Sequence, residues 1–200
     1  MRTTRMSLGK PVRRHILKGT LATSLGWKNS LFAWTSLPAD AEKNLIQREN
    51  ELPGSTDWQL TRVRVDQSGY RSPWIEGYCS KQSVAAGESI DIMVSTDPIQ
   101  DFKIEIFRTG YYNGCGARLM TTLGPFKGKS QRMPEMGDRQ LHECRWEPCV
   151  SLTIPHDWTS GVYLGRLTTT SDASGHGYWQ SYVVFIVRDD RPADILFQCS

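Results

Sequence analysis

The feature that most constrains the fold of this chain is a period-two pattern of apolar residues in two neighbouring segments. Ser89–Ser95 reads Ser-Ile-Asp-Ile-Met-Val-Ser, and Phe102–Arg108 reads Phe-Lys-Ile-Glu-Ile-Phe-Arg. Successive side chains of a β-strand point to opposite faces, so a period of two places the apolar side chains of each segment on one face. Both segments are therefore predicted to be strands with one buried face, and Glu105 is expected on the solvent side.

Further apolar segments extend this β pattern over residues 74–190. Turn sequences rich in Gly, Pro, Asn and Asp separate the segments, and no long stretch of helical periodicity occurs outside the N-terminal region. The pattern predicts an all-β domain, namely an antiparallel β-sandwich of the immunoglobulin-like type. The additional strands are expected at Gly161–Leu167, Tyr178–Arg188, Ala117–Leu123, Glu143–Trp146 and Val150–Ile154.

The first 41 residues have the composition of an export signal. Arg13 and Arg14 lie in Val-Arg-Arg-His-Ile-Leu-Lys, which is similar to a twin-arginine signal, and a short apolar stretch follows. Further on, Ala39 and Ala41 form a small-x-small cleavage site. Residues 1–41 are therefore predicted to be a signal peptide recognised by the twin-arginine export machinery, which places the protein in the periplasm or outside the cell. The alternative is a basic N-terminus with a chance arginine pair.

The charge of the remaining chain does not indicate a nucleic-acid partner. The whole chain has 24 Lys and Arg, 21 Asp and Glu, and a net charge of +3. Residues 1–41 hold seven of the bases and one of the acids, so residues 42–200 have 17 bases, 20 acids and a net charge of −3. A nucleic-acid-binding surface is basic, so no nucleic-acid partner is expected. Residues 42–73 are polar and rich in turn residues, and we interpret them as a linker that Trp58 anchors to the domain.

Two of the five cysteines, Cys144 and Cys149, are close enough in sequence to raise the question of a disulfide. An exported protein meets oxidising conditions, so these two residues form a bridge if the chain turns back between them. The other interpretation is that both are ordinary thiols. We favour it, because a protein that folds in the cytoplasm before export must not depend on disulfides to fold.

No group of residues has the spacing of a catalytic or metal site, and we assign none. The histidines beyond the signal are scattered without ligand spacing, and there is no nucleophile elbow or phosphate loop. The most suggestive segment is Gly110–Gly116, in which glycines flank Tyr111 and Tyr112. Tyrosines on a tight loop are good contact residues, so these two are candidates for contact with a following domain or with a ligand. Packing onto the end of the sandwich is the simpler interpretation.

Consecutive segments between residues 49 and 200 resemble one protein family, and their order and density are more specific than any single motif. They resemble the N-terminal region of the large (beta) subunit of N,N-dimethylformamidase and its relatives. The segments that carry this resemblance are Trp74–Tyr78, Ser83–Glu88, Val94–Thr96, Ile104–Gly114, Gly116–Met120, Cys144–Pro148, Asp157–Leu164, Gln180–Tyr182 and Phe185–Asp190.

The resemblance implies a domain order and a chemistry. In that family a β-sandwich precedes a larger α/β catalytic domain, which implies that residues 191–200 begin such a domain and that Asp194–Gln198 is its first strand, with the rest cut off. The family enzyme hydrolyses the C–N bond of a small linear amide, using a mononuclear iron held by two tyrosines and a glutamate. Those ligands belong to the domain after the sandwich, so no cofactor, metal ligand or catalytic residue is expected in this segment.

These inferences favour an accessory, non-catalytic β-sandwich of an exported N,N-dimethylformamidase-like protein, with its own C-terminal domain as its partner. Whether the protein is an enzyme stays open, because the catalytic region of the family falls outside these residues. Two alternatives remain. One is an exported ligand-binding module, for instance for a carbohydrate, that uses the Tyr111–Tyr112 loop. The other is an assembly domain that mediates homo-oligomer contacts.

Overall fold

The computed structural model describes residues 43–67, 69, 71–170, 175 and 177–193. These residues form eight strands, one short α-helix and two 3₁₀ turns, which confirms the prediction of an all-β domain. The elements are α1 (Leu45–Asn50), β1 (Glu76–Cys79), β2 (Ser83–Ala85), β3 (Ser89–Ser95), β4 (Phe102–Thr109), η1 (Tyr112–Gly114), β5 (Ala117–Phe126), η2 (Asp138–Gln140), β6 (Val150–Thr153), β7 (Gly161–Thr169) and β8 (Gln180–Arg188).

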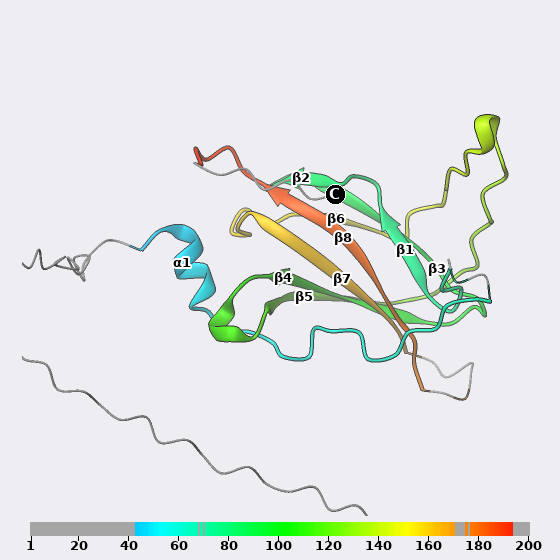
Figure 1. Cartoon of the computed structure of the whole chain (residues 1–200), viewed down its shortest axis with the longest axis horizontal. Coiled ribbons are helices and arrows are strands. Elements are labelled where there is room, and N and C mark those ends of the chain that lie inside the picture. Colours follow the sequence, from blue (N-terminus) through cyan, green and yellow to red (C-terminus); the bar gives the residue numbers. More distant parts are fainter. Residues whose placement is uncertain (1–42, 68, 70, 171–174, 176, 194–200) are drawn as a thin grey trace, which may run out of the picture. The chain divides into compact units, whose positions relative to one another are not determined.

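The strands form two sheets that pack against each other. The smaller sheet has the order β1-β3-β6, and the larger has the order β2-β8-β7-β4-β5 (Figure 1). All pairings are antiparallel except that of the short edge strand β2 with β8, which is parallel. The antiparallel sandwich predicted from the sequence is thus present, with one parallel pair at the edge of the larger sheet.

The core lies between the two sheets and contains the residues that the alternation predicted. In β3, Ile90, Ile92 and Val94 are fully buried, and in β4 the same holds for Phe102, Ile104 and Ile106. Each fully buried aliphatic or aromatic side chain contributes about 1.5–3 kcal/mol to folding, so these two strands alone supply a large share of the stabilisation. The remaining core residues come from strands of the larger sheet and from loops: Ile75, Val84, Ile154, Trp158, Tyr163, Leu167, Val183, Phe185 and Val187.

One predicted strand is absent and is replaced by a long loop. The prediction of a strand at Glu143–Trp146 is wrong, because these residues belong to the segment between β5 and β6, residues 127–149. This segment extends away from the sheets and carries η2 near its tip (Figure 1). Trp146 holds the base of the loop: its ring lies 5.4 Å from that of Tyr78, and its Nε1 donates to the carbonyl oxygen of Arg132 at 2.8 Å.

The polar segment before β1 contains structure of its own. The helix α1 begins with a capping box, in which Asn44 Oδ1 accepts from the backbone N–H of Gln47 and the Gln47 side chain accepts from that of Asn44, both at 2.9 Å. A capping box satisfies two backbone donors that have no partner within the helix, which lets so short a helix form at the domain surface. Within the described residues, no helix is long and apolar enough to cross a bilayer. The predicted signal, with Arg13, Arg14, Ala39 and Ala41, and the predicted strand Asp194–Gln198 lie outside the described residues.

Candidate functional site

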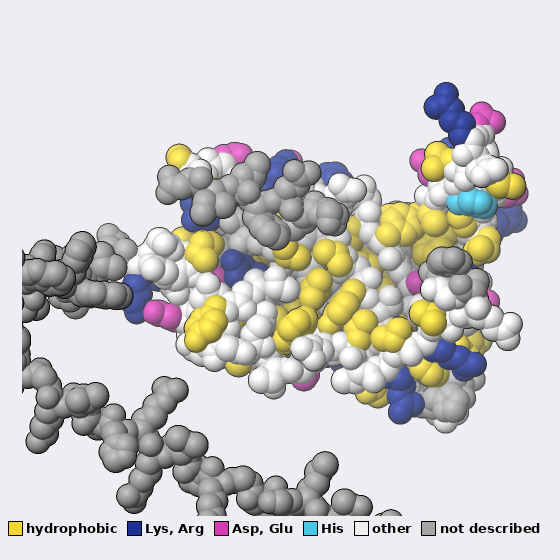
Figure 2. Space-filling model, viewed as in Figure 1, with side chains coloured by type: hydrophobic (Ala, Val, Ile, Leu, Met, Phe, Trp, Pro, Cys, Tyr) yellow, Lys and Arg dark blue, Asp and Glu magenta, His cyan; other side chains and the backbone are white. Residues whose placement is uncertain are grey.

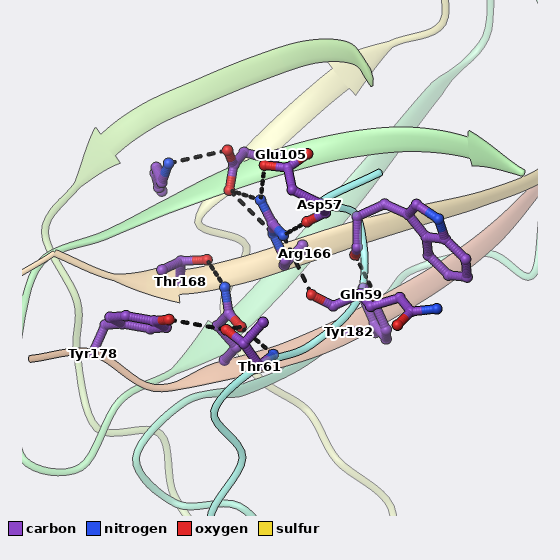
Figure 3. Close-up of polar contacts among 11 residues, drawn as sticks. Asp57, Gln59, Thr61, Glu105, Arg166, Thr168, Tyr178 and Tyr182 are labelled. Atoms are coloured by element: carbon purple, nitrogen blue, oxygen red, sulfur yellow. Dashed lines mark hydrogen bonds and ion pairs between the residues drawn. The ribbon is translucent and has the colours of Figure 1, made fainter. Parts of the chain in front are cut away.

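The outer face of the larger sheet carries a buried ion pair beneath residues 55–61, a segment that we call the strap. Arg166 on β7 faces Glu105 on β4, and its Nη2 lies 3.0 Å from Glu105 Oε2. Arg166 Nη1 also donates to the backbone carbonyl oxygens of Asp57 and Gln59 in the strap (Figure 3). The expectation that Glu105 faces solvent is therefore wrong. The side chain is on the outer face of its strand, but the strap covers that face and leaves Glu105 only 9% exposed.

Further hydrogen bonds fix the strap along its length. Trp58 Nε1 donates to the carbonyl oxygen of Cys115 at 2.9 Å, which confirms that Trp58 anchors this segment. Tyr182 Oη on β8 donates to the carbonyl oxygen of Trp58 at 2.5 Å, and the Thr61 N–H donates to Gln180 Oε1 at 2.9 Å (Figure 3). The strap is thus a packed layer of the domain, although composition alone suggested a linker.

The structure separates the two candidate contact tyrosines. Tyr111 is 68% exposed, whereas Tyr112 is fully buried. The turn reverses sharply because Tyr112 and Asn113 both have positive φ, 39° and 56°. It needs glycine at position 110, where a Cβ atom would come within 2.6 Å of Asn50 Oδ1, the atom that accepts from the Tyr111 N–H. Of the two tyrosines, only Tyr111 is accessible to a further domain or ligand.

Tyr112 belongs to a buried polar group at this end of the sandwich, the Glu49 cluster, which consists of Glu49, Arg108, Tyr112, Arg118 and Thr159. Glu49 Oε1 accepts from Tyr112 Oη at 2.8 Å and from Arg118 Nε at 3.2 Å. Arg108 Nη1 donates to Tyr112 Oη at 2.8 Å, and Thr159 Oγ1 donates to Glu49 Oε2 at 3.4 Å. Burial, followed by the hydrogen bond to the Glu49 carboxylate, raises the pKa of Tyr112 to about 12.

The cluster holds separate segments of the chain together. Arg108 Nε and Nη2 donate to the carbonyl oxygens of Thr159 and Ser160, at 3.3 and 2.8 Å, while Glu49 belongs to α1 and Tyr112 to η1. All buried side-chain nitrogen and oxygen atoms of the described residues have a hydrogen-bond partner. A fully satisfied polar network of this kind fixes the geometry of the segments that it joins.

The Glu49 cluster contains a glutamate and a tyrosine, so we compared it with the iron-ligand set that the family resemblance implies. The fit fails on two counts. Glu49 and Tyr112 already bond to each other and to Arg118 and Arg108, and these two guanidinium groups would repel a cation. No group of three or more His, Cys, Asp or Glu side chains converges elsewhere among the described residues. The Glu49 cluster therefore does not fit that iron-ligand set.

The cysteines of the described part of the chain are thiols. Cys144 is exposed and Cys149 is half-buried, with its Sγ 3.5 Å from the carbonyl oxygen of Val94. Burial raises the pKa of Cys79 to about 12, which keeps that thiol protonated and unreactive. A disulfide between Cys144 and Cys149 under oxidising conditions stays the alternative to the thiols favoured from the sequence.

The loop formed by residues 127–149 encloses an open cavity of about 730 Å³. Charged groups around it pair with one another: Lys129 Nζ lies 2.5 Å from Glu147, and Arg145 Nη2 lies 2.9 Å from Glu143. Met133 is exposed at its rim, and basic, acidic and hydrophobic side chains are mixed over the tip of the loop (Figure 2). Arg132, Glu135 and Asp138 also line the cavity, so its lining carries charges of both signs.

The fold and its polar clusters define a class of protein, a β-sandwich domain whose buried charges support structure. Residues 103–200 match the family model described as N,N-dimethylformamidase beta subunit-like, C-terminal. Over these residues the chain is similar to the N,N-dimethylformamidase beta subunit-like family. The match begins in strand β4 and includes β5 to β8, so it starts within the sandwich. A search of curated proteins found no match.

Proposed function

We propose that this domain is a non-catalytic accessory β-sandwich of an exported, N,N-dimethylformamidase-like amide hydrolase. The observation that carries the proposal is the extent of the family match, which runs from β4 through β8 to residue 200. Sandwich strands and the residues after them thus belong to one family unit. The geometry supports a structural role, because the two buried arginines Arg108 and Arg166 both bind backbone carbonyls that position loops.

The accessory role also gives a use to Tyr111 as a contact with a following domain. The side chain is exposed beside α1, at the end of the sandwich from which the chain continues after β8. There Arg191 Nη2 donates to Ser160 Oγ at 3.0 Å, and the carbonyl of the same serine binds Arg108. A domain that follows residue 193 thus starts near Tyr111.

The catalytic part of the proposal is tested by assaying the purified chain with N,N-dimethylformamide in the presence of iron and measuring released dimethylamine. We expect release no faster than in buffer with iron alone. Release that depends on the protein and is abolished by an iron chelator would overturn the accessory role. If release occurs, measuring it with the variant Tyr112→Phe tests whether the Glu49 cluster is responsible.

Export is tested by fractionating cells that produce the chain with Arg13→Lys and Arg14→Lys together. We expect the unaltered chain to be shortened near Ala41 and found in the periplasmic fraction, and the double variant to remain at full length in the cytoplasm. The matched control carries Arg2→Lys and Arg5→Lys, which make the same change outside the arginine pair and are expected to leave export intact. Equal export of both double variants would contradict a twin-arginine signal.

A further inference from the structure

A second group of arginines lies at the other end of the larger sheet, on the surface. This arginine–aromatic cluster consists of Arg62, Arg64, Trp74, Tyr178 and Trp179. The rings of Trp74 and Trp179 are 5.7 Å apart, and Arg64 Cζ lies 5.3 and 5.8 Å from their centroids. Arg62 Cζ lies 5.4 Å from the ring of Tyr178 and 6.0 Å from that of Trp179. The two guanidinium groups and three rings thus form one connected cluster, in which the two indole rings are tilted by 35°.

The backbone on both sides of the stack is fixed by hydrogen bonds. The carbonyl of Arg62 accepts from the N–H of Gln180, and that of Arg64 accepts from Ser72 Oγ, both at 2.8 Å. The N–H of Trp179 donates to Thr169 Oγ1 at 2.8 Å. The cluster is therefore held in place before any ligand arrives, which reduces the entropy that binding would cost.

The charge of Arg64 is not neutralised within the described structure. Its exposed guanidinium forms none of the ion pairs found there, and the nearby carboxylate of Glu76 is engaged by Arg71. A guanidinium stacked on aromatic rings still directs its N–H donors outward in its own plane, where they match the two oxygens of a carboxylate or sulfate. In Figure 2, basic side chains lie beside hydrophobic ones near the start of β8.

We propose that the arginine–aromatic cluster binds an acidic polysaccharide, with Arg64 holding a carboxylate or sulfate group and the exposed edge of Tyr178 contacting a sugar ring. One observation favours a polysaccharide over a lipid bilayer. Arg62 and Arg64 contact the same Trp179 ring, so the alternating residues Val63 and Val65 point to the other side of this extended segment. The cationic face therefore lacks the aliphatic side chains that insertion into a bilayer would require.

The proposal is tested by measuring the affinity of the purified full chain for a polyuronate and for a sulfated polysaccharide at physiological ionic strength. Hydrogen exchange locates the bound polymer, and slower exchange is expected at residues 61–65 and 178–180. A charge-assisted hydrogen bond contributes about 1.5–3 kcal/mol, so Arg64→Gln should weaken binding at least about tenfold. Arg64→Lys keeps the charge but loses the planar fork, and it should weaken binding by a smaller factor. Stronger binding to the polyuronate indicates recognition of a carboxylate, and stronger binding to the sulfated polysaccharide indicates recognition of a sulfate.

The basic residues before Ala41 also attract polyanions, so the test depends on matched variants. Arg48→Gln removes the same charge from an exposed arginine of α1, at the other end of the sandwich, and should leave affinity within about twofold. Equal losses for Arg48→Gln and Arg64→Gln, or unchanged exchange at residues 61–65, would overturn the proposal. So would tighter binding to phosphatidylglycerol vesicles than to either polymer. None of these outcomes bears on amide hydrolysis, which tests the accessory role separately.

Discussion

The two arginine clusters at opposite ends of the sandwich place the same side chain in opposite environments. In the Glu49 cluster, Arg108 is only 4% exposed and its donors bind the Tyr112 hydroxyl and backbone carbonyls. In the arginine–aromatic cluster, Arg64 is exposed, lies over two indole rings and forms no ion pair within the described residues. In the first cluster the arginine donors bind groups of the protein and stabilise the fold, whereas in the second the donors of Arg64 remain available for a ligand.

The difference shows how to tell a structural arginine from a binding one without knowing the ligand. A buried guanidinium must have its donors satisfied within the protein, since an uncompensated buried charge costs several kcal/mol. A guanidinium on an exposed aromatic surface avoids this cost in free energy, because water molecules bind its donors until a ligand replaces the water. The two clusters should therefore respond in opposite ways to substitution, one mainly in stability and the other mainly in binding.

The largest expected effect is loss of stability on removal of the Glu49 carboxylate. Glu49→Ala leaves Arg118 and the Tyr112 hydroxyl without their shared acceptor, and we expect it to lower the free energy of unfolding by about 3 kcal/mol. Chemical denaturation followed by tryptophan fluorescence measures the change. Glu51→Ala is the control, since Glu51 pairs only with Lys43 at the surface, and it should cost less than about 1 kcal/mol. An equal loss of stability in the two variants would contradict the structural role of the Glu49 cluster.

A smaller effect is expected at alkaline pH. An unfolded tyrosine ionises near pH 10, whereas Tyr112 in the folded protein keeps its proton up to about pH 12. The folded state therefore holds more protons between these values, so its stability is fully present below pH 10 and falls as the pH rises toward 12. Measured at several pH values in this range, the free energy of unfolding should fall less steeply for Tyr112→Phe than for the unaltered protein. Parallel pH profiles would show that the Tyr112 proton is not linked to folding.

The strands of the core were predictable because alternation is a local property of the chain. Ile90, Ile92 and Val94 repeat at the period that a half-buried strand requires, and all three are buried as expected. Glu143–Trp146 also alternates, but these residues have no neighbouring strand to pair with and belong to the 127–149 loop. A strand needs a hydrogen-bonded neighbour, and a short sequence pattern does not reveal whether one is available.

The polar clusters were less predictable because each joins residues far apart in the chain. Glu105 lies on the outer face of its strand, where a charged residue is expected to be exposed. It is buried because the strap, some 45 residues earlier in the chain, covers that face. Likewise a tyrosine in a glycine-rich turn looks exposed, and Tyr112 is buried because its hydroxyl donates a hydrogen bond to Glu49, far away in the sequence. The one local signal was Trp58, a large apolar residue in a polar segment, which correctly indicated that the segment packs on the domain.

The smallest effect on stability is expected in the arginine–aromatic cluster, and it completes the comparison. Arg64→Gln removes one exposed guanidinium from the two indole rings, and such a cation contributes about 0.5–1 kcal/mol in an exposed setting. We expect the free energy of unfolding to fall by no more than about 1 kcal/mol, and the hydrogen-exchange rates of the core strands to stay unchanged. A loss as large as that of Glu49→Ala would mean that Arg64 is also a structural arginine. A weakening of polyanion binding with stability nearly intact is the result that separates the two ends of the sandwich, because only an arginine whose donors face solvent can lose its ligand without loosening the fold.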